Sequence, residues 1–240
     1  MNALGTAIGI IALAIAPIAF LLWFFYTRDK LNPEPRGLIL KIFLLGMLAA
    51  VPVVLLQWLL PLPRFWVAVA IVPIVAELAK YCMVRWGVYD SAEFDEPVDG
   101  IIFAAVVGLG FATLENIVVL LLTYFAIASV TVPGAGLPLS PLQAVLDLFA
   151  VRGLLGALGH ALWSGFWGYG LGFTKFPDSH SRGLVGKGLL AAVLSYALFN
   201  ALALSPGLLP RLAMVLLLAI SWFAVMRGVG RALAMSPLRE

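Results

Sequence analysis

The chain has 240 residues, of which 63% are hydrophobic and 11% are charged, and its mean hydropathy is +1.07. A soluble domain is close to half apolar and about a quarter charged, so this composition excludes an ordinary soluble domain and indicates a membrane protein. The formal net charge of +3 comes from basic residues that punctuate apolar runs without clustering, which argues against nucleic-acid binding. We expect one integral-membrane domain over residues 1–240, with the lipid bilayer as its surroundings.

The cysteine content and the N-terminal segment exclude further kinds of site and segment. Cys82 is the only cysteine in the sequence, which excludes an intramolecular disulfide and a cysteine-rich metal site. The N-terminal apolar run continues to about Tyr26 and has no basic region before it. This length is typical of a retained first membrane span rather than a cleaved signal peptide.

Apolar runs long enough to cross a bilayer, about 20 residues each, recur along the chain. Segments with Pro, Gly and charged residues separate them. For the amphipathic segment 141–151, the sequence leaves open one extra interfacial helix. The predicted fold is therefore all-α, a polytopic membrane bundle of about seven transmembrane helices, at residues 3–26, 38–60, 65–84, 99–127, 152–173, 186–203 and 210–227.

Basic residues are unequally distributed between the two sides that these spans define. Because cytoplasmic loops are enriched in Lys and Arg, we predict the N-terminus outside and the C-terminus in the cytoplasm. Only Arg64, Arg152 and Arg211 are assigned to the outer side. The residues assigned to the cytoplasmic side are Arg28, Lys30, Arg36, Lys41, Lys80, Arg85, Lys175, Arg182, Lys187, Arg227, Arg231 and Arg239.

Polar side chains interrupt four of the spans. Residues three or four apart share a helix face, so three of the four pairs form local polar patches. Exposure of such patches to lipid is costly, so we predict that they converge inside the bundle. The pairs are Glu77 with Lys80, Glu115 with Asn116, His160 with Ser164 and Tyr196 with Asn200.

Each pair also has a purely structural explanation. Glu77 and Lys80 can form an ion pair near a helix end, and Ser164 lies among small residues that suit helix–helix contact. Glu115 is the hardest to explain in this way, because it lies deep in its span without a helical cation neighbour. We therefore predict one polar cavity that receives the side chains of Glu77, Glu115, His160 and Asn200.

These motifs, in this order on successive spans, are similar to those of the PrsW family of glutamate-dependent intramembrane proteases. That family is related to CAAX prenyl endopeptidase-like membrane proteins. The resemblance covers about residues 70–203, which we expect to be the catalytic core. The segments that carry it are AELAKY, EFDEPVDGIIFAAVVGLGFATLEN, HALWSGFWGYGLG and YALFN.

The resemblance implies an intramembrane endopeptidase of the bacterial cell membrane, with membrane-anchored substrates such as anti-sigma-factor-like regulators. By position it assigns catalytic roles to Glu77, Glu115 and His160. Two residues depart from the family pattern, since Ala76 replaces a glutamate and Tyr196 replaces a histidine. Impaired activity is therefore one expected outcome. The residues to which we assign supporting or oxyanion-binding roles are Lys80, Asn116, Tyr196 and Asn200.

Peptide hydrolysis needs a base for water, donors for the oxyanion and an acid for the leaving amine. Glu77 and Glu115 would share the role of base, and His160 would shuttle a proton or donate to the oxyanion. We expect no metal cofactor. Zinc bound by these three residues is the rival mechanism. The sequence contains no HExxH segment, and His180, the other histidine, lies in the loop 174–185.

Two other classes of function stay open on the sequence alone. One is a catalytically silent membrane protein that binds transmembrane segments or lipids. The other is a proton-coupled transporter in which Glu115 is the titrating carboxylate. Transporters of that kind usually have repeated halves or interrupted helices, and the sequence shows neither.

Overall fold

A computed structural model describes residues 3–29, 31–130, 140–176 and 183–238. Within these ranges the regular structure is entirely helical. Seven helical segments are long and apolar enough to cross a membrane, which confirms the predicted all-α bundle of seven spans. They are Leu4–Tyr26, Arg36–Gln57, Arg64–Gly87, Pro97–Ile127, Pro141–Lys175, Leu184–Ala203 and Leu208–Ala234.

Five of these spans are single α-helices, and two are composite. The third and fifth spans each contain a π-helical segment, η1 and η2, which joins two α-helical parts without a break. The elements in chain order are α1 (Ala3–Tyr26), α2 (Arg36–Leu59), α3 (Arg64–Trp66), η1 (Val67–Ile71), α4 (Val72–Gly87), α5 (Pro97–Val130), α6 (Pro141–Leu148), η2 (Phe149–Gly156), α7 (Ala157–Lys175), α8 (Leu184–Ala203) and α9 (Leu208–Ala234).

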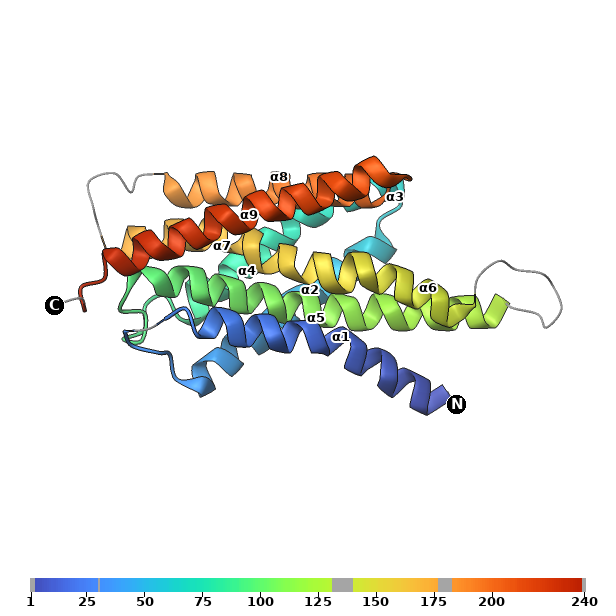
Figure 1. Ribbon diagram of the computed structural model, residues 1–240, viewed down its shortest axis with the longest axis horizontal. Coiled ribbons are helices and arrows are strands. Elements are labelled where there is room, and N and C mark those ends of the chain that lie inside the picture. The colour runs from blue at the N-terminus through green and yellow to red at the C-terminus, as the bar shows by residue number, and fades with distance from the viewer. Residues whose placement is uncertain (1–2, 30, 131–139, 177–182, 239–240) are drawn as a thin grey trace.

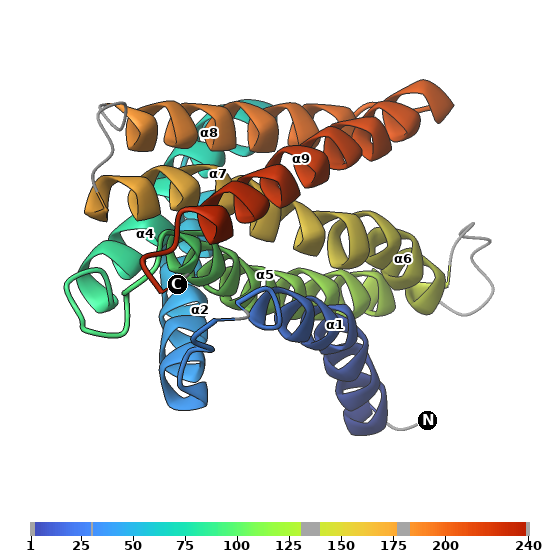
Figure 2. The same cartoon turned by 60° about the vertical axis from the view of Figure 1, so that its left-hand side comes forward.

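Helix α5 is the centre of the bundle. It lies between α1 and α2 on one side and α7, α8 and α9 on the other (Figures 1 and 2). In the span that α5 forms, 67% of the most apolar stretch is buried, compared with 44% in the fifth span. An apolar helix that is enclosed by protein on most sides can hold polar side chains away from lipid.

The segment 141–151 is not a separate interfacial helix. The Ser140 hydroxyl accepts a hydrogen bond from the Gln143 backbone N–H and starts α6, which continues through η2 into α7. Its apolar face finds protein partners, since Val145 is fully buried against residues of α1 and α5, including Leu120. The segment is therefore the start of the fifth span, and its amphipathic face packs against α1 and α5.

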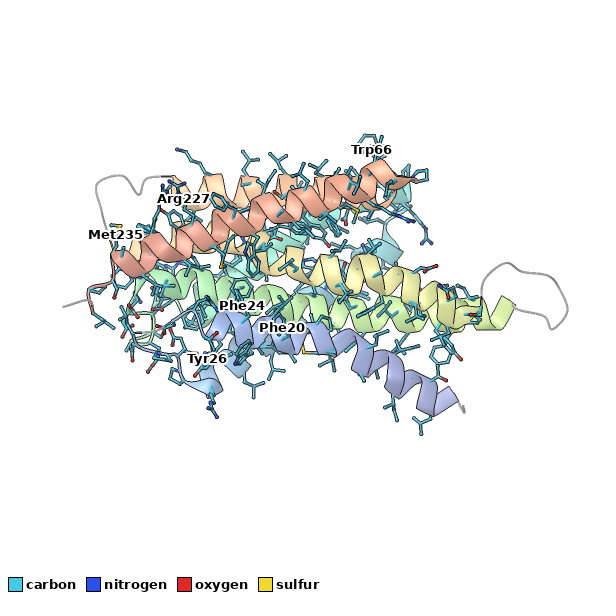
Figure 3. The ribbon with its side chains drawn as sticks, in the orientation of Figure 1. Phe20, Phe24, Tyr26, Trp66, Arg227 and Met235 are labelled. Atoms are coloured by element: carbon cyan, nitrogen blue, oxygen red, sulfur yellow. The ribbon has the colours of Figure 1, made fainter. Side chains whose placement is uncertain are left out.

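The outer surface of the bundle is apolar. Large hydrophobic side chains project from the helices along its length, and Phe20 and Trp66 are 60% and 59% exposed (Figure 3). Trp66 lies near one end of the bundle, and Tyr26, Arg227 and Met235 lie toward the other (Figure 3). A surface of this kind suits lipid rather than water. Together with the seven spans, it makes the chain an integral membrane protein.

The contact between α5 and α7 is made backbone to backbone. A Cβ atom added at Gly108 would collide with the carbonyl oxygen of His160, and one at Gly168 would collide with that of Gly100. Small residues permit this approach between membrane helices. Because Gly108 touches the backbone of His160, this contact also fixes the position of that histidine relative to α5.

We expect Gly108→Ala to destabilise the protein, because the added methyl group must displace the His160 backbone. Overpacking of this kind costs roughly 1–3 kcal/mol. Thermal unfolding in detergent should therefore show a lower Tm for Gly108→Ala. Gly230→Ala on α9 is the control, since nothing lies within 4 Å of the added Cβ. Equal Tm values for the two variants would contradict the close-contact explanation.

Candidate functional site

Polar side chains from four helices meet inside the bundle. Glu77 and Lys80 come from α4 and are completely buried. Glu115 comes from α5, His160 from α7 and Tyr196 from α8, and each is at most 3% exposed. The structure thus brings together the three residues to which the sequence assigns catalysis, together with two of their expected supporting residues.

A chain of contacts connects the two glutamates. The Lys80 Nζ atom lies 2.5 Å from Glu77 Oε1 and 3.5 Å from His160 Nδ1. The His160 Nε2 atom lies 3.1 Å from Glu115 Oε2. An ammonium group can only donate, so Nδ1 accepts from Lys80 and the ring proton belongs on Nε2, where it donates to Glu115. Each member of the chain therefore orients the next.

Glu77 is surrounded by donors. Besides Lys80 on Oε1, its Oε2 atom accepts hydrogen bonds from Ser164 Oγ at 3.2 Å and from Trp167 Nε1 at 2.9 Å. A buried ion pair is tolerated when further hydrogen bonds satisfy the remaining lone pairs, and Ser164 and Trp167 meet this condition. Ser164 also lies beside Gly108, so it combines the expected helix-contact role with a polar one.

Glu115 has a more open environment than Glu77. Its Oε1 atom lies 3.4 Å from the Tyr196 hydroxyl and 3.7 Å from Nη1 of Arg152. Arg152 comes from the π-helical segment η2, and its side chain is 25% exposed. The bias in basic residues assigns Arg152 to the outer side, and neither Arg152 nor Trp167 was predicted as part of the site. A basic residue at the start of an apolar span was the available signal for Arg152.

One small cavity is lined by Glu115, and a larger one lies next to that cavity. The smaller has a volume of about 10 Å³, which is room for about one water molecule. The larger is a hollow of about 320 Å³, and the two share Arg152 and Asn200 as lining residues. The water-sized pocket is lined by Glu115, Arg152, Gly156, His160, Trp163, Tyr196, Phe199 and Asn200. The hollow is lined by Ala68, Asp147, Leu148, Val151, Arg152, Asn200, Ala203 and Leu204.

Asn200 and Asn116, the other two predicted supporting residues, have different surroundings. Asn200 lines the pocket, but its Nδ2 atom donates to the Ala68 carbonyl oxygen of η1 at 2.7 Å. The Nδ2 atom of Asn116 is buried without a hydrogen-bond partner among the described residues. Ala76 is completely buried next to Glu77 in α4. His180 lies outside the described residues.

The chain is similar to known intramembrane proteases. A family model described as PrsW family intramembrane metalloprotease matches residues 34–226. Protease PrsW of Geobacillus kaustophilus strain HTA426 is 30% identical over 93% of this chain and 92% of the relative. Protease PrsW of Bacillus subtilis strain 168 is 33% identical over 72% of each chain. No solved structure matches the chain.

The word metalloprotease in the family description implies a metal, but Glu77, Glu115 and His160 do not fit zinc in this arrangement. Both ring nitrogens of His160 and both oxygens of Glu77 already face hydrogen-bonding partners, and the Lys80 ammonium lies among them. A zinc ligand needs a free lone pair directed at the ion. In the described part of the chain, the side chains with three converging metal-ligand atoms are elsewhere, at Asp29, Glu96 and Asp99.

We expect Lys80→Met to lower stability strongly, since it leaves the Glu77 carboxylate buried without its cation. Breaking a buried ion pair costs about 3–5 kcal/mol. The double variant Lys80→Met with Glu77→Gln should regain much of the lost Tm, because the amide still accepts from Ser164 and Trp167. Arg85→Met is the control, since its pair with Asp90 is exposed and its loss should change Tm little. A double variant less stable than Lys80→Met would contradict this explanation.

Proposed function

Because the chain belongs to the PrsW family of intramembrane proteases, we propose that its Glu115–His160 pair hydrolyses peptide bonds of membrane-anchored proteins. The observation that carries this proposal is the water-sized pocket against Glu115. Hydrolysis inside a bilayer requires a water molecule next to a base, and this pocket provides room for one. Regulators of the anti-sigma-factor type are the proposed substrate class, as the family resemblance implies.

Glu115 is the proposed general base. Its carboxylate takes a proton from the water while the water oxygen bonds to the carbonyl carbon of the substrate. The electron pair of the C=O double bond then moves onto the carbonyl oxygen. When the carbonyl re-forms, the C–N bond breaks, and the proton on Glu115 passes to the leaving nitrogen. His160 holds the carboxylate in place through its Nε2–H group, 3.1 Å from Oε2.

Arg152 and Tyr196 are the proposed donors to the oxyanion. Both line the water-sized pocket, and both point a donor at the same Glu115 oxygen, Oε1. Donors that are already positioned where negative charge develops lower the barrier without reorganisation. Asn116 and Asn200 remain supporting residues in this proposal. Asn200 acts by holding η1 at Ala68, which borders the hollow.

Glu77 is the proposed positioning residue rather than a second base. Its two oxygens accept from Lys80, Ser164 and Trp167, which leaves it poorly placed to take a proton from water. Through Lys80 it fixes the proton on Nε2 of His160. In this proposal Glu77 orients His160 through Lys80, and Glu115 is the base.

The hollow of about 320 Å³ is the proposed access route for the substrate chain. It lies among η1, α6, η2 and α8, and Arg152 and Asn200 separate it from the water-sized pocket. A peptide segment that displaces the Arg152 side chain would bring its carbonyl carbon to the pocket. Apolar lining with few polar groups is typical of sites that position a ligand.

We expect Glu115→Gln to reduce cleavage by roughly 100-fold or more, the usual contribution of a general base. The assay is cleavage of a single-pass membrane reporter in proteoliposomes, with the products identified by mass spectrometry. Glu93→Gln, at an exposed position, is the control and should cleave like the parent. Retained cleavage by a folded Glu115→Gln protein would contradict the proposal.

The same assay addresses the two departures from the family pattern. If Ala76 and Tyr196 impair this chain, Ala76→Glu or Tyr196→His should raise cleavage, and Glu115→Gln should abolish the gain. Strong cleavage by the parent would show that the departures do not impair it. Absence of cleavage from every folded variant would favour the silent, substrate-binding alternative. Tyr196 already lies beside Glu115 as a donor, but a phenol is a poor base near neutral pH.

We also propose that the N-terminus lies outside and the C-terminus in the cytoplasm of a bacterial cell. Lys80 and Arg152 belong to the site inside the bundle, so they are left out of the comparison of basic residues on the two sides. Among the other basic residues, only Arg64 and Arg211 are assigned to the outer side. We expect a cysteine at position 205 in a Cys82→Ser protein to be labelled from outside intact cells, and one at position 93 to be protected. The reverse pattern would overturn the orientation.

A further inference from the structure

Three buried carboxyl groups converge at one end of the bundle, remote from the site described above. Asp29 lies in the loop between α1 and α2, Glu96 precedes α5, and Asp99 lies in its first turn. One ligand oxygen from each lies within 4.8 Å of the others, and the residues are 4%, 0% and 0% exposed. Asp99 and Glu115 are both on α5, about 24 Å apart at a rise of 1.5 Å per residue.

In Asp29 and Asp99, one carboxylate oxygen accepts backbone hydrogen bonds and the other has no partner among the described residues. Asp29 Oδ1 accepts two backbone N–H groups of its own loop, each at 3.2 Å. Asp99 Oδ2 accepts the N–H groups of Asp95 and Glu96 at 2.9 and 2.7 Å, and so caps α5. The remaining oxygens, Asp29 Oδ2, Asp99 Oδ1 and both of Glu96, are buried without a hydrogen-bond partner among the described residues.

No described basic side chain forms an ion pair with these three residues. Lys175 is near, but its Nζ atom donates to the carbonyl oxygens of Tyr89 and Ser91 at 2.6 and 3.0 Å. Lys30 follows Asp29 in the sequence and lies outside the described residues. Buried carboxylates without compensation are costly, so these oxygens require a proton or a cation.

The surrounding carboxyl groups repel one another. Burial, and then the charges of Asp99 and Asp29, raise the pKa of Glu34 to about 9. A bound cation would relieve this repulsion for several carboxylates at once, whereas a proton relieves it for one.

We propose that Asp29, Glu96 and Asp99 bind a hard divalent cation, Mg²⁺ or Ca²⁺. An all-oxygen set of carboxylates suits these ions, while zinc in proteins favours nitrogen and sulfur ligands. The ion joins the loop 27–35 to the loop 88–96 and to the start of α5. Its distance from Glu115 makes this a structural site, which holds one end of the central helix.

The test uses the full-length protein in detergent, treated with EDTA and then titrated with MgCl₂, CaCl₂ or ZnCl₂. Calorimetry should show one site for Mg²⁺ or Ca²⁺, and the saturating ion should raise Tm by at least about 3 °C. Glu96→Gln and Asp29→Asn should abolish both effects. The matched control is Glu93→Gln, an exposed residue of the same loop, which should keep both.

A second signature separates a cation site from a merely structural cluster. Without added cation, Glu96→Gln should be at least as stable as the EDTA-treated parent, because it removes a repelling charge. A lower Tm for that variant without cation, no binding of either ion, or binding of zinc alone would overturn the proposal. The proposal would also be overturned if Lys30→Gln had a lower Tm than the parent and added cation left the Tm of the parent unchanged.

The proposed cation site is independent of the proposed catalysis. Glu115→Gln removes the proposed base and leaves the three carboxylates intact, so it should bind the cation as the parent does. Failure of the cleavage assay with intact cation binding would overturn the proposed function alone. Intact cleavage without cation binding would overturn this inference alone.

Discussion

Charge inside a membrane bundle must be compensated, and this requirement organises the protein. The Lys80 ammonium lies between Glu77 and His160, and His160 in turn contacts Glu115. Such contacts require that α4, α5 and α7 approach closely, which explains the backbone contact at Gly108. If these helices separated, the Glu77–Lys80 pair within α4 would lose Ser164, Trp167 and His160. Glu115 would lose His160, and a buried charge left without partners costs several kcal/mol. Packing and electrostatics therefore stabilise the same arrangement.

The two buried glutamates, for which we propose different roles, have different environments. Glu77 accepts hydrogen bonds on both oxygens from Lys80, Ser164 and Trp167. Glu115 has one oxygen toward His160 and the other beside a pocket with room for about one water. A carboxylate saturated with donors is a rigid support, whereas one with an accessible lone pair can accept a proton. This difference comes from partners on α7 and η2, many residues away in the sequence.

The sequence predicts which polar residues of the spans lie inside the bundle, but not the contacts that depend on local helix geometry or on distant loops. Helical spacing and the cost of lipid exposure predict one polar cavity for the side chains of Glu77, Glu115, His160 and Asn200. Glu115, His160 and Asn200 line the water-sized pocket, whereas Glu77 does not line it and is connected to His160 through Lys80. Arg152 was not identified, because its place in the site depends on the π-helical segment η2, and the sequence gives no direct signal for that segment. The continuity of 141–151 with α7 was missed because periodicity shows an amphipathic face but not which surface covers it. The convergence of Asp29 with Glu96 depends on loops that are 67 positions apart.

The small size of the pocket beside Glu115 has a consequence for the membrane itself. A polar path through a bilayer filled by a file of water molecules would conduct protons and dissipate the electrochemical gradient that the cell maintains. Here the pocket has room for about one water, and the rings of Trp163 and Phe199 form part of its wall. One water molecule cannot by itself relay protons from one aqueous phase to the other. The proposed hydrolytic site, with room for about one water, therefore does not by itself open a proton path across the bilayer.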